Sequence, residues 1–301
     1  TALRRQAWGH QRLAAAVIQQ REGGGRQQGG DVLKQPLVMR PQMARADIQR
    51  YLAVPIIQPF FVETHGAALE ALSGALCLSG LEYDQGLPNE ESWSVLIGIL
   101  PDAHAVGLRA AQLVENLVRS KPSAVLGLAA GATPEAMYGE MVRRHQDNGL
   151  DFSKASVFGL DEYLGIGADH PASCAHTLKH CLIDRVNLDH SRICLVDGRH
   201  AGPLPAYCAD YEQRIQQAGG IDLQILGLGV NGHIGFNEPG CSLAGRTHPL
   251  VLRANTRKTN GPIFEKLGEE VPRAALSMGV ATILRARRIL LLATGPTKAE
   301  A

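Results

Sequence analysis

Short apolar runs alternate with amphipathic segments through the last two thirds of the chain. The runs SVLIGIL at 94–100, SAVLGLA at 123–129 and DLQILGLG at 222–229 have the length and composition of buried strands. Between such runs, apolar residues recur at helical spacing, as in 101–120 and 206–219. Repeated strand–helix units of this kind predict an α/β, Rossmann-like fold: a mostly parallel sheet with helices on both faces.

Three further runs extend the predicted sheet, and one helix start is marked. ASVFGLDEY at 155–163, RICLVDG at 192–198 and RRILLLATG at 287–295 each predict a strand. The segment 133–145 is predicted to be a helix with Thr133 as its N-cap. In open parallel sheets ligands bind beyond the carboxyl ends of the strands, so a site is expected there.

The first 93 residues differ in composition from the rest. Residues 1–50 hold nine Arg and Lys against three Asp and Glu, together with nine Gln and the run REGGGRQQGG. Residues 51–93 reverse the sign, with six acidic residues and no Lys or Arg. This composition favours a poorly ordered extension over 1–93, followed by a folded domain over 94–301.

Composition narrows the classes of function. The 301-residue chain is 45% apolar and carries a net charge of +1, which gives no electrostatic reason to expect nucleic acid or an anionic membrane as a partner. No apolar run approaches the roughly 18 residues needed to span a bilayer, and no export signal is visible. Six scattered cysteines without a C-x-x-C pair are typical of reduced thiols, which favours a cytoplasmic location.

Histidines and cysteines gather in one segment, HPASCAHTLKHC at 170–181. His176 and His180 would share a helix face, a spacing that zinc sites use. However, the glutamate of an H-E-x-x-H motif is missing, and no second ligand pair lies at the spacing of a zinc finger. The pattern therefore favours ordinary helix-surface histidines, and no metal is expected.

Polar or glycine-rich residues follow four of the predicted strands. After 123–129, Gly131 permits a tight turn, and the helix start at Thr133 offers free N–H groups and a positive dipole end, which suit a phosphate. A plain, well-capped turn would explain the same residues. Asp161 follows VFGL, where a carboxylate could abstract a proton next to a carbonyl. A carboxylate at that place also serves commonly as a helix or loop cap.

The stretch GLGVNGHIGFNEPG at 227–240 has the G-x-G-x-x-G spacing of a dinucleotide-binding turn. In that fold the third glycine leads into a helix, with an acidic residue about 20 positions later. Here Pro239 breaks any helix after Gly232, and no acid follows at that distance, so the context argues against a nicotinamide cofactor. Instead, Glu238 lies five residues after His233, close enough in a compact turn for the carboxylate to orient a proton-transferring imidazole.

A lysine follows the last predicted strand. Lys298 comes three residues after 287–295, where its charge could meet a phosphate. A solvated lysine would account for that residue alone. Four such groups at the carboxyl ends of one parallel sheet form a more specific pattern, so we expect an acid, an imidazole and an anion-binding turn to face one cleft.

At these residues the chain resembles the glucosamine-6-phosphate deaminase family, also called glucosamine-6-phosphate isomerases. The similar stretches are, in order, LGLAAGATPEAMY, GLDEYLG with HPAS, GLGVNGHIGFNEPG, SLAGRTH, MGVATILRAR and LLLATGPTKAEA. They run from about residue 95 to the end of the chain, and GHIGFNEP is quite specific. The related 6-phosphogluconolactonases share the fold but typically continue GH with a different sequence. Residues 1–93 lie outside the resemblance.

The resemblance implies an enzyme that converts an amino-sugar 6-phosphate and water to fructose 6-phosphate and ammonia, without metal or organic cofactor. It assigns ring opening to His233, held and tuned by Asn231 and Glu238, and the transfer of a proton from C2 to C1 to Asp161. It assigns the 6-phosphate to the loop formed by Gly131, Ala132 and Thr133, together with Lys298. Because such folds usually assemble, we also expect a homo-oligomer.

Three departures from the family pattern affect these expectations. Many members read N-A-R-F-F where this chain reads NGPIF, so Pro262 stands where an arginine is expected to grip the phosphate; Arg257 and Lys258 are nearby cations. The positions at which allosteric members bind an N-acetyl sugar phosphate carry other side chains, so allosteric activation is not expected. The family continues through another helix and strand after the position of Ala301, so the fold is expected to be C-terminally truncated.

Two other functions fit the same residues. A galactosamine-6-phosphate deaminase or another sugar-phosphate isomerase would use the same scaffold, because contacts to phosphate and hydroxyl groups set specificity. A non-catalytic sugar-phosphate sensor with an N-terminal DNA-binding unit would fit the basic extension, but it would not need Asp161, His233 and Glu238 together. Ordered helix-turn-helix structure within 1–60 would favour the sensor, and ammonia release would favour the enzyme.

Overall fold

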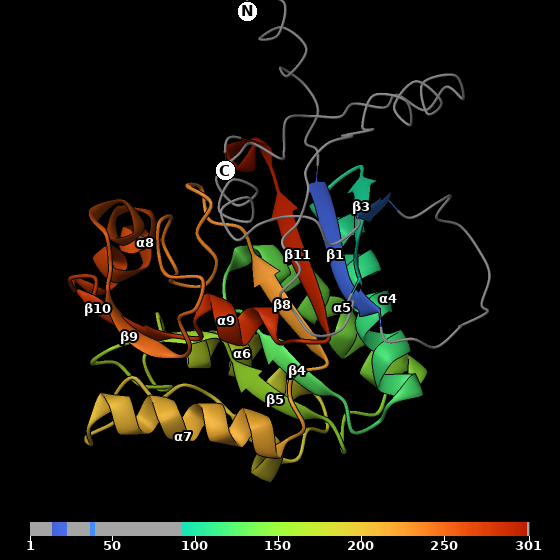
Figure 1. The fold of residues 1–301 in the computed structure, drawn as a ribbon, viewed down its shortest axis with the longest axis horizontal. Coiled ribbons are helices and arrows are strands. Elements are labelled where there is room, and N and C mark those ends of the chain that lie inside the picture. The colour runs from blue at the N-terminus through green and yellow to red at the C-terminus, as the bar shows by residue number, and fades with distance from the viewer. Residues whose placement is uncertain (1–13, 23–36, 40–91, 300) are drawn as a thin grey trace, which may run out of the picture.

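A central sheet with helices on its two faces dominates the computed structural model, which describes residues 14–22, 37–39, 92–299 and 301 (Figure 1). The sheet has eight strands in the order β2-β3-β1-β11-β8-β4-β5-β7. Their bounds are β1 Ala14–Glu22, β2 Leu37–Met39, β3 Ser92–Leu100, β4 Val125–Leu128, β5 Ser156–Gly159, β7 Ile193–Cys194, β8 Leu223–Gly227 and β11 Arg288–Thr294. A second, three-stranded sheet consists of β6 Asp161–Tyr163, β10 Ala274–Ser277 and β9 His248–Val251.

Helices connect most of these strands. The α-helices are α4 Ala103–Ser120, α5 Ala132–Asn148, α6 Cys174–Cys181, α7 Leu204–Gln217, α8 Ala254–Leu267 and α9 Val280–Leu284. Short 3₁₀ helices follow at η1 Ile183–Arg185, η2 His190–Arg192 and η3 Pro296–Lys298. Among the described residues, none of the helices is long and apolar enough to cross a membrane.

The middle of the large sheet is parallel. β11, β8, β4, β5 and β7 run in the same direction, each hydrogen-bonded to the next. β1 pairs antiparallel with both β11 and β3, and β2 pairs antiparallel with β3. A parallel sheet needs both of its faces covered, because each strand carries apolar side chains on both sides.

Alternate residues of the strands enter two separate cores. Leu126 of β4 packs with residues of α4, α5 and α6 on one face of the sheet. Its neighbour Val125 packs with residues of α7 and α9 on the other face. Leu290 and Ile289 of β11 divide between the same two cores. The prediction of a mostly parallel sheet with helices on both faces is confirmed.

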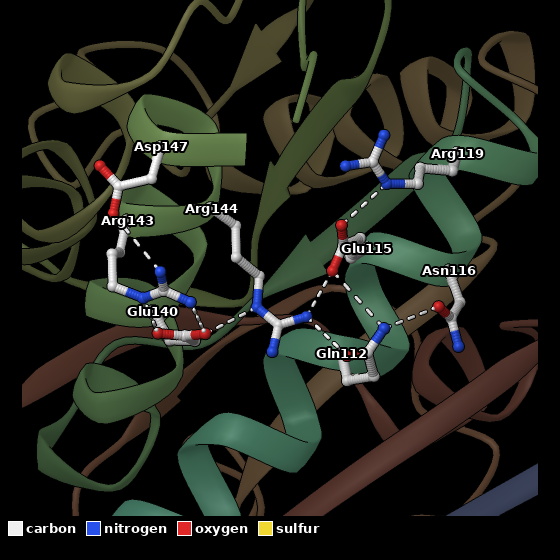
Figure 2. Close-up of polar contacts among 8 residues, drawn as sticks. All are labelled: Gln112, Glu115, Asn116, Arg119, Glu140, Arg143, Arg144 and Asp147. Carbon is white, nitrogen blue, oxygen red and sulfur yellow. Dashed lines mark hydrogen bonds and ion pairs between the residues drawn. The ribbon is translucent and has the colours of Figure 1, made fainter. Parts of the chain in front are cut away.

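A network of charged side chains joins α4 to α5 (Figure 2). Arg144 lies between two glutamates. The Nε of Arg144 donates a hydrogen bond of 2.7 Å to the carboxylate of Glu140, and its guanidinium also pairs with Glu115 of the neighbouring helix. Arg143 also donates from Nε to Glu140 over 2.7 Å. Only 12% of the Arg144 side chain is exposed. The network therefore cross-links two helices through a nearly buried cation whose carboxylate partners are both present.

Two details of the elements differ from the sequence prediction. The helix predicted to start after a Thr133 N-cap begins at Ala132, with Gly131 as its cap at a φ of 119°. The run 155–163 is two strands rather than one, because the chain changes sheet at Leu160. The Leu160 N–H bonds to the carbonyl of Leu128 in the large sheet, and its own carbonyl accepts from Met278, next to the small sheet.

The described parts of the 1–93 segment are the strands β1 and β2 and the first two residues of β3. β1 inserts between β3 and β11, and β2 pairs with the far edge of β3. The division of the chain at residue 94 stays a prediction. The rest of that segment, including most of REGGGRQQGG and all of 51–91, lies outside the described residues.

Candidate active site

Four neighbouring parallel strands deliver the candidate residues to one edge of the sheet. β4 is followed by Gly131 at the start of α5, and β5 is followed by Asp161. β8 leads into the loop that holds His233, and β11 leads into η3 with Lys298. Because β11, β8, β4 and β5 are adjacent and parallel, their carboxyl ends lie at the same edge.

Asp161 opens β6, and its carboxylate has no cation partner among the described residues. Burial is the main cause that raises the pKa of Asp161 to about 7, and the neighbouring charge of Glu162 adds to it. A hydrogen bond from the thiol of Cys174 opposes the shift. A carboxyl group with such a pKa is ionised in part at neutral pH and is a much stronger base than an ordinary aspartate.

Glu162, the next residue, has a different role. Its buried carboxylate accepts hydrogen bonds from the Ser173 hydroxyl at 2.6 Å and from the backbone N–H groups of Cys174 at 3.1 Å and Ala175 at 2.9 Å. These donors lie at the N-terminus of α6, where a carboxylate is stabilised by free N–H groups and the helix dipole. A cap is the alternative role for Asp161, but it is the neighbouring Glu162 that caps a helix here.

A chain of hydrogen bonds fixes the imidazole of His233. Its Nδ1 lies 2.6 Å from Asn231 Oδ1, and Asn231 Nδ2 donates to Glu238 Oε2 over 2.7 Å. The hydroxyl of Thr256 on α8 donates to the other oxygen of Glu238. With Asn231 accepting, Nδ1 carries the proton and Nε2 is free to accept another. The predicted pairing of His233 with Glu238 is therefore indirect, through Asn231.

The surroundings of His233 favour its neutral form. Burial lowers the pKa of His233, the Lys298 charge lowers it further, and the Glu238 carboxylate partly offsets both. The ring lies against the backbone of Gly229, where a Cβ would be 2.2 Å from ring atoms. The second glycine of the G-x-G-x-x-G stretch thus makes room for an imidazole and not for a pyrophosphate.

The same loop contacts Asp161. Gly235 has a φ of 57°, and a Cβ added there would lie 3.2 Å from Asp161 Oδ2 and 3.0 Å from Ser277 Oγ. Glycine is therefore required both for the left-handed backbone and for the close approach of the carboxylate. Since Gly235 is only two residues from His233, the base and the imidazole border the same part of the molecule.

The remaining predicted residues lie at the start of α5 and in η3. Gly131, Ala132 and Thr133 start α5, so their N–H groups point out of the helix end. The Tyr138 hydroxyl donates to the carbonyl of Ala129 over 2.7 Å and ties this loop to the helix. Lys298 is partly buried, and burial lowers its pKa. Its charge is one of the causes that lower the pKa of His233.

α8 carries the position at which the family pattern has an arginine. Pro262 lies inside this helix, and because a proline side chain is uncharged it cannot replace an arginine at a phosphate. Arg257, one helical turn and a half earlier, has its Nε buried without a hydrogen-bond partner among the described residues.

Among the residues that the structure describes, no group of three His, Cys, Asp or Glu side chains could hold a metal ion. His176 and His180 stack on α6 with ring centroids 6.4 Å apart.

Sequence reasoning missed two residues that complete the site. Thr256 contacts Glu238 from α8, and Cys174 contacts Asp161 from α6. Neither belongs to a motif that signals such a contact, because each meets its partner only through the packing of a helix on the sheet. The fold and the site together define an α/β protein with acid–base side chains at the carboxyl edge of its parallel sheet.

Comparison with known proteins places this chain in a family. The model of the glucosamine-6-phosphate isomerases/6-phosphogluconolactonase family matches residues 102–301. The glucosamine-6-phosphate deaminase of Arthrobacter sp. (strain FB24) is 46% identical over 203 residues, which cover 67% of this chain and 77% of that protein. That of Thermoanaerobacter sp. (strain X514) is 44% identical over 193 residues, covering 64% and 76%. The chain therefore belongs to the glucosamine-6-phosphate isomerase/6-phosphogluconolactonase family.

Solved structures agree with this placement. A monomeric glucosamine-6-phosphate deaminase matches with a TM-score of 0.60 and 40% identity, covering 63% of this chain and 78% of that one. A devB protein matches with a TM-score of 0.51 at 15% identity, covering 62% and 75%, which shows a shared fold only.

Proposed function

We propose that the protein is a glucosamine-6-phosphate deaminase, which converts glucosamine 6-phosphate and water to fructose 6-phosphate and ammonia. The observation that carries the proposal is a high-pKa carboxyl, Asp161, in contact with the loop that holds a neutral, oriented imidazole, His233. An aldose–ketose conversion needs a base at carbon and a separate acid–base group at oxygen, and these two residues supply both. The names of the relatives support the same substrate.

Ring opening falls to His233. With its Nδ1 proton held by Asn231, the free Nε2 takes the proton of the O1 hydroxyl and returns it to O5 as the C1–O5 bond breaks. The neutral state of the ring at physiological pH suits this shuttle, because the imidazole must accept a proton before it gives one. Glu238 acts through Asn231 and stabilises the ring while it carries the extra proton.

Isomerisation falls to Asp161. The carboxylate removes the C2 proton of the open aldehyde, which gives an enolamine, and then delivers a proton to C1. The product carries an imine at C2, and water adds to that carbon as ammonia leaves, which gives the ketone of fructose 6-phosphate. Each positioned group contributes a factor of roughly 10²–10⁴ to the rate. The N–H groups of Gly131–Thr133 and the Lys298 ammonium hold the 6-phosphate during these steps.

The test is a coupled assay that measures ammonia and fructose 6-phosphate from the same reaction. Glucosamine 6-phosphate is expected to give both in equal amounts, with Asp161→Asn as the inactive control. Galactosamine 6-phosphate and 6-phosphogluconolactone are run in parallel. Turnover of either of these in place of glucosamine 6-phosphate would assign a different substrate within the same family, and tight binding of all three without products would favour a sensor.

The location and assembly of the enzyme are part of the same proposal. The reaction on a phosphorylated sugar, together with the free state of the five described cysteines, supports the cytoplasm. A homo-oligomer stays a prediction, and one solved relative is described as monomeric. Light scattering coupled to size-exclusion chromatography measures the mass directly, and a mass of 32.3 kDa would rule out the oligomer.

A further inference from the structure

A buried amide fastens the turn that follows His233. Asn237 is 5% exposed, and its Nδ2 donates to the carbonyl of Ile234 over 3.0 Å, within the turn, and to the carbonyl of Met278 over 2.7 Å, outside it. The backbone N–H groups of Ile234 and Asn237 also donate to each other's carbonyls, at 3.2 Å and 3.0 Å. Residues 234–237 therefore form a closed turn, and the Asn237 side chain ties this turn to the residue that follows β10.

The peptide that receives this bond also holds the chain next to the proposed base. The N–H of Met278 donates to the carbonyl of Leu160 over 2.8 Å, and Leu160 immediately precedes Asp161. Ser277, the last residue of β10, is the partner of Asp161 in the ladder between β10 and β6. One path of hydrogen bonds thus runs from the residue before the base, through Met278 and Asn237, to the residue after the imidazole.

The base and the imidazole depend on this path to different degrees. Asp161 is fixed by the ladder between β6 and β10, to which the side chain of Asn237 does not contribute. His233 lies on a loop, and the 2.7 Å bond from Asn237 joins the turn of that loop to the end of β10. Longer bonds to the Ser277 hydroxyl, at 3.3 Å from the Phe236 N–H and 3.4 Å from Asn237 Nδ2, support the same junction. Loss of the amide should therefore displace the imidazole and leave the base in place.

We propose that Asn237 is a positioning residue that sets the place of the His233 imidazole relative to the Asp161 carboxylate. The catalytic meaning of this role rests on the proposed function, whereas the hydrogen bonds do not. Gly235, inside the same turn, shows how closely the turn meets the base, because a Cβ added there would lie 3.2 Å from Asp161 Oδ2. A group that transfers a proton must lie within hydrogen-bond reach of it, and a misplacement of about 1 Å can cost roughly 10²-fold in rate.

The first test compares two substrates in one variant. Asn237→Ala should lower kcat on cyclic glucosamine 6-phosphate roughly tenfold at nearly unchanged KM, because the displaced imidazole opens the ring slowly. An open-chain analogue, which needs Asp161 but not ring opening, should lose less than about twofold in kcat. Equal losses on the two substrates would overturn the proposal.

The matched control is an asparagine that joins two segments away from the site. Asn187 accepts from the Phe152 N–H over 2.9 Å and donates to Asp151 over 2.7 Å. Asn187→Ala removes a comparable pair of bonds and should keep the wild-type kcat on both substrates. A loss on the cyclic substrate as large as that in Asn237→Ala would show that any such amide affects the rate through the fold alone.

A double-mutant cycle separates positioning from a general loss of folded protein. In the His233→Gln background the imidazole is absent, so adding Asn237→Ala should lower kcat by less than about twofold. If the two substitutions instead multiply in their effects on kcat, Asn237 does not act through His233 and the proposal is wrong.

A measurement without turnover makes failure of this proposal distinguishable from failure of the proposed function. The titration of the His233 imidazole is followed by NMR in the full chain, with His233→Gln used to assign the signal. Because burial lowers the pKa of His233, a displaced ring should titrate at a higher pH in Asn237→Ala and at the wild-type pH in Asn187→Ala. If the wild type releases no ammonia but the midpoint moves in this way, the proposed function fails and the placement of the ring by Asn237 stands.

An unchanged midpoint in Asn237→Ala contradicts the proposal whatever the kinetics show. Should that variant not fold, Asn237→Ser takes its place, since a serine side chain is too short to bond to the carbonyls of both Ile234 and Met278. The same two results decide for it: a higher midpoint with a selective loss on the cyclic substrate supports the role, and an unchanged midpoint overturns it.

Discussion

Glu140 on α5 and Asp161 on β6 are carboxylates in well-packed surroundings of the same domain, yet their pKa values move in opposite directions. The hydrogen bond from Arg143 is the main cause that lowers the pKa of Glu140 to about 2, with Arg144 acting in the same sense (Figure 2). Burial raises the pKa of Asp161 to about 7, and no cation opposes it among the described residues. The two regions therefore differ in whether the chain itself supplies the counter-charge.

This difference separates a structural network from a reactive site. Around Arg144 every charge is met by a neighbour, so the network joins α4 to α5 and has little capacity for a proton near neutral pH. At the carboxyl edge of the sheet, Asp161 and Lys298 lack ion-pair partners among the described residues, and burial shifts both pKa values towards the uncharged form. Groups with shifted pKa values and no ion-pair partner within the protein are the ones with which a substrate can interact.

The largest expected effect comes from removing the base. Asp161→Asn should lower kcat by roughly 10²–10⁴-fold and leave KM little changed, because the carboxylate acts on the C2 proton in the transition state. Steady-state kinetics on glucosamine 6-phosphate measure both constants. Glu140→Gln serves as the matched control, since it changes a carboxyl of the structural network and should retain nearly full kcat. Equal losses in the two variants would remove the distinction between the regions.

A somewhat smaller effect is expected at the imidazole. His233→Gln should lower kcat by roughly 10²-fold on the cyclic substrate, because ring opening loses its proton shuttle. An open-chain analogue enters the reaction after that step and should suffer much less. The comparison of the two substrates in one variant is the measurement, and equal damage to both would contradict the assignment.

The proposed phosphate-binding residues should show their effect in KM. Lys298→Ala is expected to raise KM about tenfold, or about 1.4 kcal/mol, with kcat nearly unchanged, because the lysine contacts a phosphate that does not react. Lys154→Ala removes an exposed lysine that is distant from Lys298 in the sequence, and this variant is the control. A drop in kcat at unchanged KM would instead place Lys298 among the groups that act on the reacting carbons, through its effect on His233.

The features of the fold and of the candidate site that depend on local sequence pattern can be predicted from the sequence. The apolar runs predict the parallel strands, and the strand ends predict the edge of the sheet near which Asp161, His233 and Lys298 lie. The break at Pro239 is enough to reject a dinucleotide turn, and the structure has no helix directly after Gly232.

Other features depend on packing between distant segments. The run 155–163 reads as one strand, because nothing local marks the exchange of partners at Leu160, where the chain passes from one sheet to the other. Thr256 and Cys174 reach the site only because α8 and α6 dock beside it. The insertion of β1 between β3 and β11 is likewise a matter of long-range register and not of composition. Contacts of this kind need the tertiary fold before they can be recognised.

The smallest expected effect is on stability. Its sign tests whether Glu140 and Asp161 differ in the way their pKa values indicate. The folded pKa of Glu140 lies below its unfolded value, so its ion pairs stabilise the fold above about pH 4.5, and this stabilisation is lost as the pH falls towards 2. Glu140→Gln should therefore lower the free energy of unfolding by about 1 kcal/mol at pH 7, a modest value because Arg143 is half exposed. At pH 3 most of the difference should be gone.

Asp161→Asn should show the opposite sign in the same denaturation experiment. The folded pKa of Asp161 lies above its unfolded value, so the carboxyl favours folding while it is protonated, and that contribution is lost as the pH rises towards 7. The amide carries no charge in these desolvating surroundings, so the variant should be more stable than the wild type at pH 8 and similar to it at pH 3. Urea unfolding of both variants across this range measures the two trends. If Asp161→Asn lost stability at pH 8 as Glu140→Gln does at pH 7, Asp161 would have to be counted with the structural carboxylates.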